Sequence, residues 1–285
     1  VGRPNVGKST LINAVIGQKI AIVSPKPQTT RRLQRGIHTT AHEQFVFCDT
    51  PGIHRPRHAL GKSMLADAIQ ALRDADVVLW VTDISYMPTG GDRNVVSRLR
   101  MDAGEKPLVL GMNKSDRLRA GDVLPHTEAF RALAPQAAWM LVSATRGDNI
   151  SELLEQLADE LPEGPRYYPE DQVTDTRMRE LAGELLREAT LYYLQKEIPH
   201  GVGVEVEAFD ESDGAVARIS ATIEVERERH KGIVIGKRGE MLKRIGTRAR
   251  REIANMLGVK VHLSTHVKVC KDWRYDRQHV ARMGY

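Results

Sequence analysis

Short apolar runs recur through the first 164 residues of this 285-residue chain, separated by amphipathic stretches. The runs cover residues 45–48, 77–81, 107–110 and 139–142, and each is long enough for a strand buried on both faces. In the stretch 150–161 the apolar residues return at helical spacing on one face, and Asn149 with Glu152 predicts a capping box at the start of this helix. Strands that alternate with helices predict an α/β unit, a mostly parallel sheet with helices on both faces.

The pattern changes after residue 164. A segment rich in Pro and Tyr comes first, and an apolar stripe at helical spacing then covers 178–193. Alternating strand patterns at 202–209 and 215–225, a glycine-containing loop, a helix and a last strand at 259–269 follow. This order predicts a separate α+β unit. We therefore predict an α/β domain over residues 1–164, a linker over 165–175 and an α+β domain over 176–285.

Charge is distributed unevenly along the chain. The net charge of +5 combines +2 over residues 1–164, −8 over 165–226 and +11 over 227–285. No apolar run approaches the ~18 residues that a membrane-spanning helix needs. Two cysteines, Cys48 and Cys270, cannot make a disulfide framework in so long a chain, which favours a reducing compartment. Because the chain begins at Val1 without an initiator Met, we expect an upstream segment.

Residues 2–9, Gly-Arg-Pro-Asn-Val-Gly-Lys-Ser, match the phosphate-binding pattern G-x-x-x-x-G-K-[ST] in full. The glycines let backbone N–H groups approach phosphate oxygens, Lys8 supplies a cation for the β- and γ-phosphates, and Ser9 offers a hydroxyl to Mg²⁺. A strand should precede this motif, so we expect the first strand of the sheet to be missing from this chain. The expected nucleotide contacts here are Gly2, Arg3, Pro4, Asn5, Val6, Gly7, Lys8, Ser9 and Thr10.

Three further motifs each follow an apolar run. The acidic start of Asp49-Thr50-Pro51-Gly52 suits a Mg²⁺ carboxylate acting through water, and Gly52 can meet the γ-phosphate with its N–H. Asn113-Lys114-Ser-Asp116 is the N-K-x-D pattern that selects guanine, because a carboxylate accepts from both guanine N1–H and the exocyclic amine. Ser143-Ala144-Thr145 would bring a backbone N–H to guanine O6. Since open α/β sheets bind ligands at the carboxyl ends of their strands, the four motifs predict one nucleotide site.

In these motifs and their order the chain resembles the translation-factor-type GTPases, and more closely the Era family. The resemblance covers essentially the whole chain, including Lys-Pro-Gln-Thr-Thr-Arg at 26–31. It implies a switch threonine that contacts Mg²⁺ and the γ-phosphate, which we assign to Thr30, with Thr29 as the alternative. It also implies that Asn5 holds a potassium ion. The expected catalytic residues are Lys8, Thr30 and Gly52, and the expected Mg²⁺ ligands are Ser9, Thr30 and Asp49.

The residue after Asp49-Thr-Pro-Gly52 is Ile53, which cannot orient an attacking water as a glutamine does. We therefore expect slow intrinsic GTP hydrolysis that a partner or K⁺ accelerates. His54 is a weaker candidate for the group that positions the water.

Gly236-Lys-Arg-Gly239 stands between two predicted helices in the basic last segment. A G-x-x-G turn in the order helix, strand, strand, helix, turn, helix, strand resembles a type II KH domain, whose loop clamps the backbone of four nucleotides. Trp273 and Tyr275 could stack on bases or pack in the core, and His266 replaces an aromatic residue common in the family. The expected RNA contacts are Ile235, Gly236, Lys237, Arg238, Gly239, Lys243, Arg244, Arg248 and Arg251.

The resemblance implies a cytoplasmic, monomeric GTPase that uses GTP, GDP and Mg²⁺ and binds single-stranded RNA rather than DNA. It further implies a target near the 3′ end of 16S rRNA and a role in assembly of the small ribosomal subunit, with peripheral association with the membrane left open. Two alternatives remain: a constitutive RNA-binding protein with a structural nucleotide site, and a GTPase that acts on another RNA such as tRNA.

Overall fold

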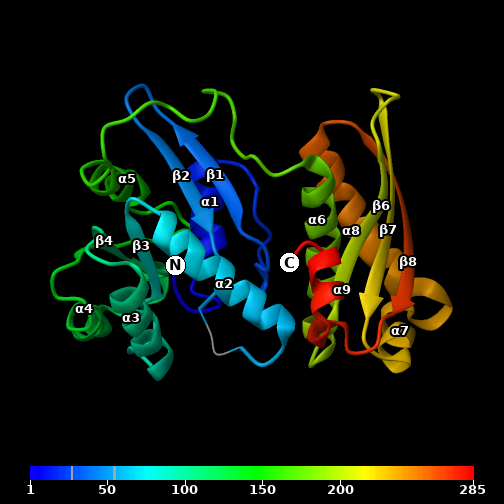
Figure 1. The fold of residues 1–285 in the computed structure, drawn as a ribbon, viewed down its shortest axis with the longest axis horizontal. Coiled ribbons are helices and arrows are strands. Elements are labelled where there is room, and N and C mark those ends of the chain that lie inside the picture. The colour runs from blue at the N-terminus through cyan, green and yellow to red at the C-terminus, as the bar shows by residue number, and fades with distance from the viewer. Residues whose placement is uncertain (27, 54–55) are drawn as a thin grey trace. The chain divides into compact units, whose positions relative to one another are not determined.

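The computed structural model describes residues 1–26, 28–53 and 56–285, and the chain divides into two compact units (Figure 1). The first unit comprises residues 1–21, 30–56 and 62–175, and the second comprises 22–29, 57–61 and 176–285. The predicted linker 165–175 is thus part of the first unit. The predicted fold class is confirmed: an α/β unit is followed by an α+β unit.

The strands of the first unit form two sheets. β1 (Gln34–Thr39) and β2 (Gln44–Asp49) make an antiparallel hairpin. β3 (Val78–Asp83), β4 (Leu108–Asn113) and β5 (Ala138–Leu141) make a parallel sheet in the order β3-β4-β5. The last four of these strands coincide, within three residues at each end, with the apolar runs of the sequence. The motif residues 49–52, 113–116 and 143–145 lie at the carboxyl ends of β2, β4 and β5.

Helices cover both faces of the parallel sheet. α1 (Lys8–Ile16) and α5 (Ile150–Ala158) bury leucines such as Leu11 and Leu157 against Val81 and Val109. α2 (Ala59–Asp74), α3 (Gly90–Asp102) and α4 (Val123–Arg131) contribute to a second cluster around the fully buried Trp80. The two clusters hold the carboxyl edge of the sheet in place from both sides.

In the described part of the chain, β2 and β3 are not paired with each other. Val1 lies beside β3: its amino group donates to the Leu79 carbonyl at 2.8 Å, and its carbonyl accepts the Val81 N–H at 2.8 Å.

Two local features differ from what the sequence predicted. β1 was not expected, because Gln34–Thr39 contains a single large apolar residue, Ile37, which is buried. The predicted capping box at Asn149 and Glu152 is wrong: Asn149 is left-handed at φ 58°, and its amide donates to the Leu141 carbonyl instead. A capping box does occur at the start of α3, between Thr89 and Asp92.

The second unit packs helices on one face of a three-stranded sheet (Figure 1). β6 (Gly203–Asp210) and β7 (Val216–Val225) are antiparallel, and β8 (Lys260–Val269) runs parallel to β7. α6 (Met178–Tyr193) and α8 (Glu240–Leu257) bury their apolar stripes on the sheet, α7 (Glu228–Ile235) precedes the G-x-x-G turn, and α9 (Arg277–Arg282) closes the unit. The order α6-β6-β7-α7-α8-β8 is the one that the sequence predicted.

Candidate functional site: a nucleotide cradle and a basic turn

The turn before α1 is shaped by its glycines. Gly7 caps the helix at φ 98°, and a Cβ there would lie 2.3 Å from the Asn113 side-chain nitrogen. A Cβ on Gly52 would lie 2.6 Å from the Pro4 nitrogen. Both positions therefore exclude larger residues. The N-terminus of α1 presents N–H groups and the positive end of the helix dipole, which together form an anion site.

Lys8 is buried at the base of this turn. Its Nζ donates to the Arg3 carbonyl at 3.0 Å and lies 3.4 Å from the Gly2 carbonyl. Burial lowers the pKa of Lys8 to about 8, and the nearby Asp49 opposes that shift. The ammonium is thus held by backbone carbonyls, in a position where phosphate oxygens would be much stronger partners.

Three side chains converge beside Lys8, one from each of three segments. Ser9 Oγ donates to Asp49 Oδ2 at 2.6 Å, Thr30 Oγ1 lies 3.1 Å from the same oxygen, and the two hydroxyl oxygens are 2.9 Å apart. Asp49 Oδ1 is buried without a hydrogen-bond partner in the described part of the chain. Hydroxyl and carboxylate oxygens are the ligands that Mg²⁺ prefers, so this donor set fits a magnesium ion.

Electrostatics at this cluster favour a cation. Burial raises the pKa of the Asp49 carboxyl, while Lys8 and the hydroxyls of Ser9 and Thr30 oppose the rise. A bound divalent cation would stabilise the ionised Asp49 carboxylate and so lower its pKa again.

The structure separates Thr30 from Thr29, the two candidates for the switch threonine. Thr30 contacts Ser9 and Asp49 in the first unit. Thr29 lies in a segment of the second unit, and its hydroxyl donates to the Lys26 carbonyl at 2.7 Å. Geometry therefore favours Thr30 as the metal ligand.

The position after Gly52 is part of the core. Ile53 is 8% exposed, packs in the cluster around Trp80, and donates its N–H to the Gly2 carbonyl at 3.1 Å. Its apolar side chain is buried in the protein and offers no polar group that could orient a water. The candidate His54 lies outside the described residues.

The guanine-selecting motif is tied to the cradle by side-chain amides. Asn113 donates to the Val6 carbonyl at 2.9 Å and accepts the Ala144 N–H at 3.0 Å. The Ala144 N–H is thus already engaged. Ser143 Oγ donates to Asp116 Oδ1 at 2.7 Å and orients that carboxylate, and it lies 3.3 Å from Thr145 Oγ1. The motif residues lie together at the carboxyl edge of β4 and β5.

Two supporting contacts were not predicted. Arg3 Nε donates at 2.7 Å to Asp92, which is 1% exposed and also accepts from Thr89. Lys114 Nζ contacts Asp83 at 2.5 Å and donates to the Asn5 carbonyl at 2.7 Å, where Asn5 is left-handed at φ 65°. The Thr-x-x-Asp spacing at 89–92 is a capping signal that could have revealed the first acidic partner.

In the second unit the G-x-x-G turn is exposed and tightly wound. Gly236 has φ 72° and ψ 175°, and Gly239 has φ 80°, which are conformations that favour glycine. A Cβ on Gly236 would lie 2.7 Å from Met241 Cβ. Lys237 and Arg238, between the glycines, are exposed, while Ile235 is half-buried. The turn therefore offers two cations on a backbone that another chain can approach closely.

The remaining predicted RNA contacts divide into two groups. Lys243 and Arg251 are exposed on α8. The guanidinium of Arg244 lies 4.7 Å from the ring centre of Tyr193, and that of Arg248 lies 3.9 Å from the ring centre of Tyr192. These two arginines are engaged in cation–π contacts with α6.

The aromatic residues near the C-terminus take different positions. Trp273 is 1% exposed and donates to the Gly201 carbonyl at 3.0 Å, so it packs in the core. Tyr275 is 60% exposed, and His266 is exposed on β8.

Comparison with solved structures decides the family. A crystal structure of Era in complex with MgGDPNP and nucleotides 1506–1542 of 16S ribosomal RNA matches with 37% identity and a TM-score of 0.94, over 100% of this chain and 96% of that chain. The chain belongs to the Era family. A point variant of Aquifex aeolicus Era bound to GDP·AlF₄⁻ matches with the same identity, TM-score and coverage.

Two family models cover most of this Era-family chain. Residues 1–114 match the model described as a 50S ribosome-binding GTPase, and residues 197–274 match the model described as a KH domain. The resemblance found in the sequence is thereby confirmed. Across residues 1–26, 28–53 and 56–285, no helix is long and apolar enough to cross a membrane.

Proposed function

We propose that this chain is a GTP-hydrolysing switch that binds single-stranded RNA at the 3′ end of 16S rRNA and assists assembly of the small ribosomal subunit. The observation that carries the proposal is the convergence of Ser9, Thr30 and Asp49 beside a buried Lys8 in the first unit, in a chain whose second unit presents an exposed Gly-Lys-Arg-Gly turn. An Era relative was solved with both MgGDPNP and 16S nucleotides 1506–1542.

In this proposal the first unit holds GTP by its phosphates and by its base. The backbone N–H groups of residues 2–10 and the Lys8 ammonium hold the β- and γ-phosphates. Asp116, oriented by Ser143, accepts from the guanine, and the Lys114 stem covers the ring. Ser9 and Thr30 would ligate Mg²⁺ directly and Asp49 through water, and the ion would neutralise charge on the phosphates.

Hydrolysis adds water to the γ-phosphorus and breaks its bond to the β–γ bridging oxygen, which releases GDP and phosphate. The chain contributes positioning and charge: Lys8 stabilises the leaving oxygens, and the Gly52 N–H meets the γ-phosphate. Because Ile53 is packed in the core, no residue at that position orients the water. We therefore propose a slow intrinsic rate, raised by a partner or by a K⁺ ion held with the help of Asn5.

The second unit would clamp RNA through the turn. Gly236 and Gly239 allow close approach of the sugar-phosphate backbone, and Lys237 and Arg238 neutralise phosphates. The proposed target places the protein in the cytoplasm with the assembling subunit. Peripheral membrane binding is a separate proposal, tested by flotation with anionic vesicles.

Adjacent threonines provide a matched test of the nucleotide site. Thr30→Ala should reduce single-turnover GTP hydrolysis about 10²-fold or more, as loss of a transition-state contact does, whereas Thr29→Ala should leave it within about twofold. Lys8→Ala should abolish measurable hydrolysis. If the wild type, Thr29→Ala and Thr30→Ala all hydrolyse GTP no faster than Lys8→Ala, the site is structural. That outcome would support the constitutive RNA-binding alternative.

The RNA assignment is tested by crosslinking in cells with sequencing of the crosslinked positions. We expect crosslinks at the 3′ end of 16S rRNA that are lost on Gly236→Ala. Crosslinks mainly to tRNA would contradict the proposed target.

A further inference from the structure

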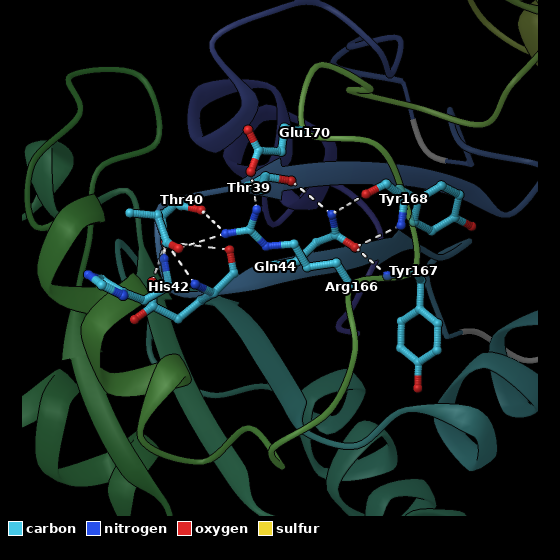
Figure 2. A network of polar contacts seen from close by, with 10 residues as sticks. Thr39, Thr40, His42, Gln44, Arg166, Tyr167, Tyr168 and Glu170 are labelled. Atoms are coloured by element: carbon cyan, nitrogen blue, oxygen red, sulfur yellow. Dashed lines mark hydrogen bonds and ion pairs between the residues drawn. The ribbon is translucent and has the colours of Figure 1, made fainter.

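The segment that leads from the first unit to the second is bound along the β1–β2 hairpin. Figure 2 shows its first part: the Gln44 side chain accepts the N–H groups of Tyr167 and Tyr168 at 2.8 and 3.0 Å and donates to the Tyr168 carbonyl at 2.9 Å. Arg166 donates to the carbonyls of Thr40 and Ala41 in the hairpin turn. We call residues 166–175 the strap.

The second part of the strap pairs with β1. Ile37 donates its N–H to the Val173 carbonyl at 2.9 Å, and Thr174 forms an antiparallel bridge with Gly36. Thr174 Oγ1 donates to the Arg35 carbonyl at 2.7 Å. The strap therefore behaves as an added edge of the hairpin, and a freely moving linker would not make these backbone bonds.

The strap ends at Asp175, the last residue of the first unit. Arg35 and Asp175 form an ion pair at 2.8 Å, and the last and longest segment of the second unit begins at Thr176. In the hairpin register Arg35 lies opposite Cys48, and Cys48 precedes Asp49. One strand pairing and one ion pair thus connect the carboxylate of the proposed Mg²⁺ site to the start of that last segment.

We propose that the strap, through Gln44 and the Arg35–Asp175 pair, couples the nucleotide site to RNA binding. These are positioning residues. When the ligands of the γ-phosphate move, the hairpin shifts with them, and the hairpin in turn moves Asp175 and the attachment of the second unit. The Arg35 and Asp175 side chains are 45% and 28% exposed, so the pair adds little stability. The contacts all join the strap to one hairpin, which fits a role in positioning the strap better than a role in stabilising the fold. This inference rests on the proposed function, in which the first unit is a GTP switch and the second unit binds RNA.

The test measures the affinity for an RNA fragment, 16S nucleotides 1506–1542, with GDP and with GDPNP, in the full chain. For the wild type we expect a ratio of about 5 to 150 between the two states, the usual range of coupled sites. Asp175→Asn and Gln44→Ala should lower the ratio to less than about a third of the wild-type value while GDP affinity and RNA affinity in the GDP state stay unchanged.

Controls separate coupling from general damage. Asp171→Asn makes the same change at an exposed strap residue, and His42→Ala alters the exposed hairpin turn; both should keep the wild-type ratio. Exchanging the charges with Arg35→Asp and Asp175→Arg together should restore the ratio lost in Asp175→Asn.

The two proposals fail in different ways. A wild-type ratio of one overturns both the switch and the coupling through the strap. A full wild-type ratio in Asp175→Asn and Gln44→Ala overturns the strap alone and leaves the proposed function standing. Should either variant fold poorly, hydrogen exchange of the wild type decides: the amides of Tyr167, Tyr168 and Ile37 must change protection together when GDPNP replaces GDP, and unchanged protection overturns the coupling.

Discussion

Burial shifts two charged residues of the nucleotide site, Lys8 and Asp49, toward their neutral forms. It lowers the pKa of Lys8 to about 8 and raises that of the Asp49 carboxyl. Both groups lie beside the turn that would hold phosphate and metal, so a magnesium nucleotide would supply each with the opposite charge that it lacks. The site is therefore arranged to bind the two ions together, since either one alone leaves a buried charge without a full partner.

The pKa of Lys8 predicts how nucleotide binding depends on pH. Phosphate prefers the protonated lysine, and the free protein loses that proton as the pH rises through about 8. Affinity for GDP should therefore be nearly constant well below that pKa and should weaken about fourfold between pH ~7 and pH ~8.5. Titration calorimetry at several pH values measures this. Lys8→Arg, which stays charged, should bind with no such dependence, and an equal pH dependence in that variant would contradict the assignment.

Ile53 predicts that a catalytic glutamine cannot simply be restored. Its side chain is 8% exposed in the core, so Ile53→Gln would bury an amide without partners and destabilise the first unit by about 1–3 kcal/mol. Ile53→Leu keeps the apolar volume and should cost less than about 1.5 kcal/mol. Denaturant unfolding measures both values. A glutamine variant with wild-type stability and faster hydrolysis would show that the position opens toward the nucleotide.

At the scale of elements, the sequence predicts those helices and strands whose apolar pattern follows from burial alone. β3 and β4 are almost entirely buried, and β2 and β5 are partly buried; each of the four carries an apolar run, so they could be located from the sequence. β1 could not, because Ile37 is its only large apolar side chain and gives no apolar run. The start of α5 was predicted wrongly because an asparagine side chain has two possible roles at this position. It can accept an N–H of the first helical turn, or it can donate to a carbonyl across the loop, as Asn149 does to Leu141.

The turn between α7 and α8 predicts a graded response to substitution. Gly239 has open space around its Cβ position and only its φ of 80° to penalise a side chain, so Gly239→Ala should cost about 1–2 kcal/mol. Gly239→Asn should cost less, because asparagine tolerates this conformation. Gly236→Ala should cost most, since its Cβ would also meet Met241 at 2.7 Å. Unfolding free energies and RNA affinities should follow this order, and a Gly236→Ala protein as stable as Gly239→Asn would contradict it.

At the scale of the whole molecule, the motifs located the nucleotide site but could not give the contacts that support it. Residues 2–9, 49–52 and 113–116 match short patterns whose chemistry is local. The Arg3–Asp92 pair spans 89 positions, and the strap reaches back more than a hundred positions to the hairpin, so both depend on tertiary packing. The charge of +11 over residues 227–285 could indicate the RNA-binding part of the chain from sequence alone, because electrostatic attraction to phosphate needs no exact geometry.

That charge leads to a prediction about salt. A clamp on four nucleotides of single-stranded RNA should give a slope of about −3 for log affinity against log salt, from about 0.7 per phosphate. Replacing Lys237 and Arg238 together by Ala should reduce the magnitude of the slope by about 1.4. Lys260→Ala is the matched control, because this exposed lysine follows the other end of α8, about 27 Å along the helix axis from the turn. Filter binding at several salt concentrations measures the slopes. If Lys260→Ala alone reduces the magnitude of the slope by about 0.7, half the effect of the double variant, the RNA is attracted by the basic segment as a whole and is not held by the turn.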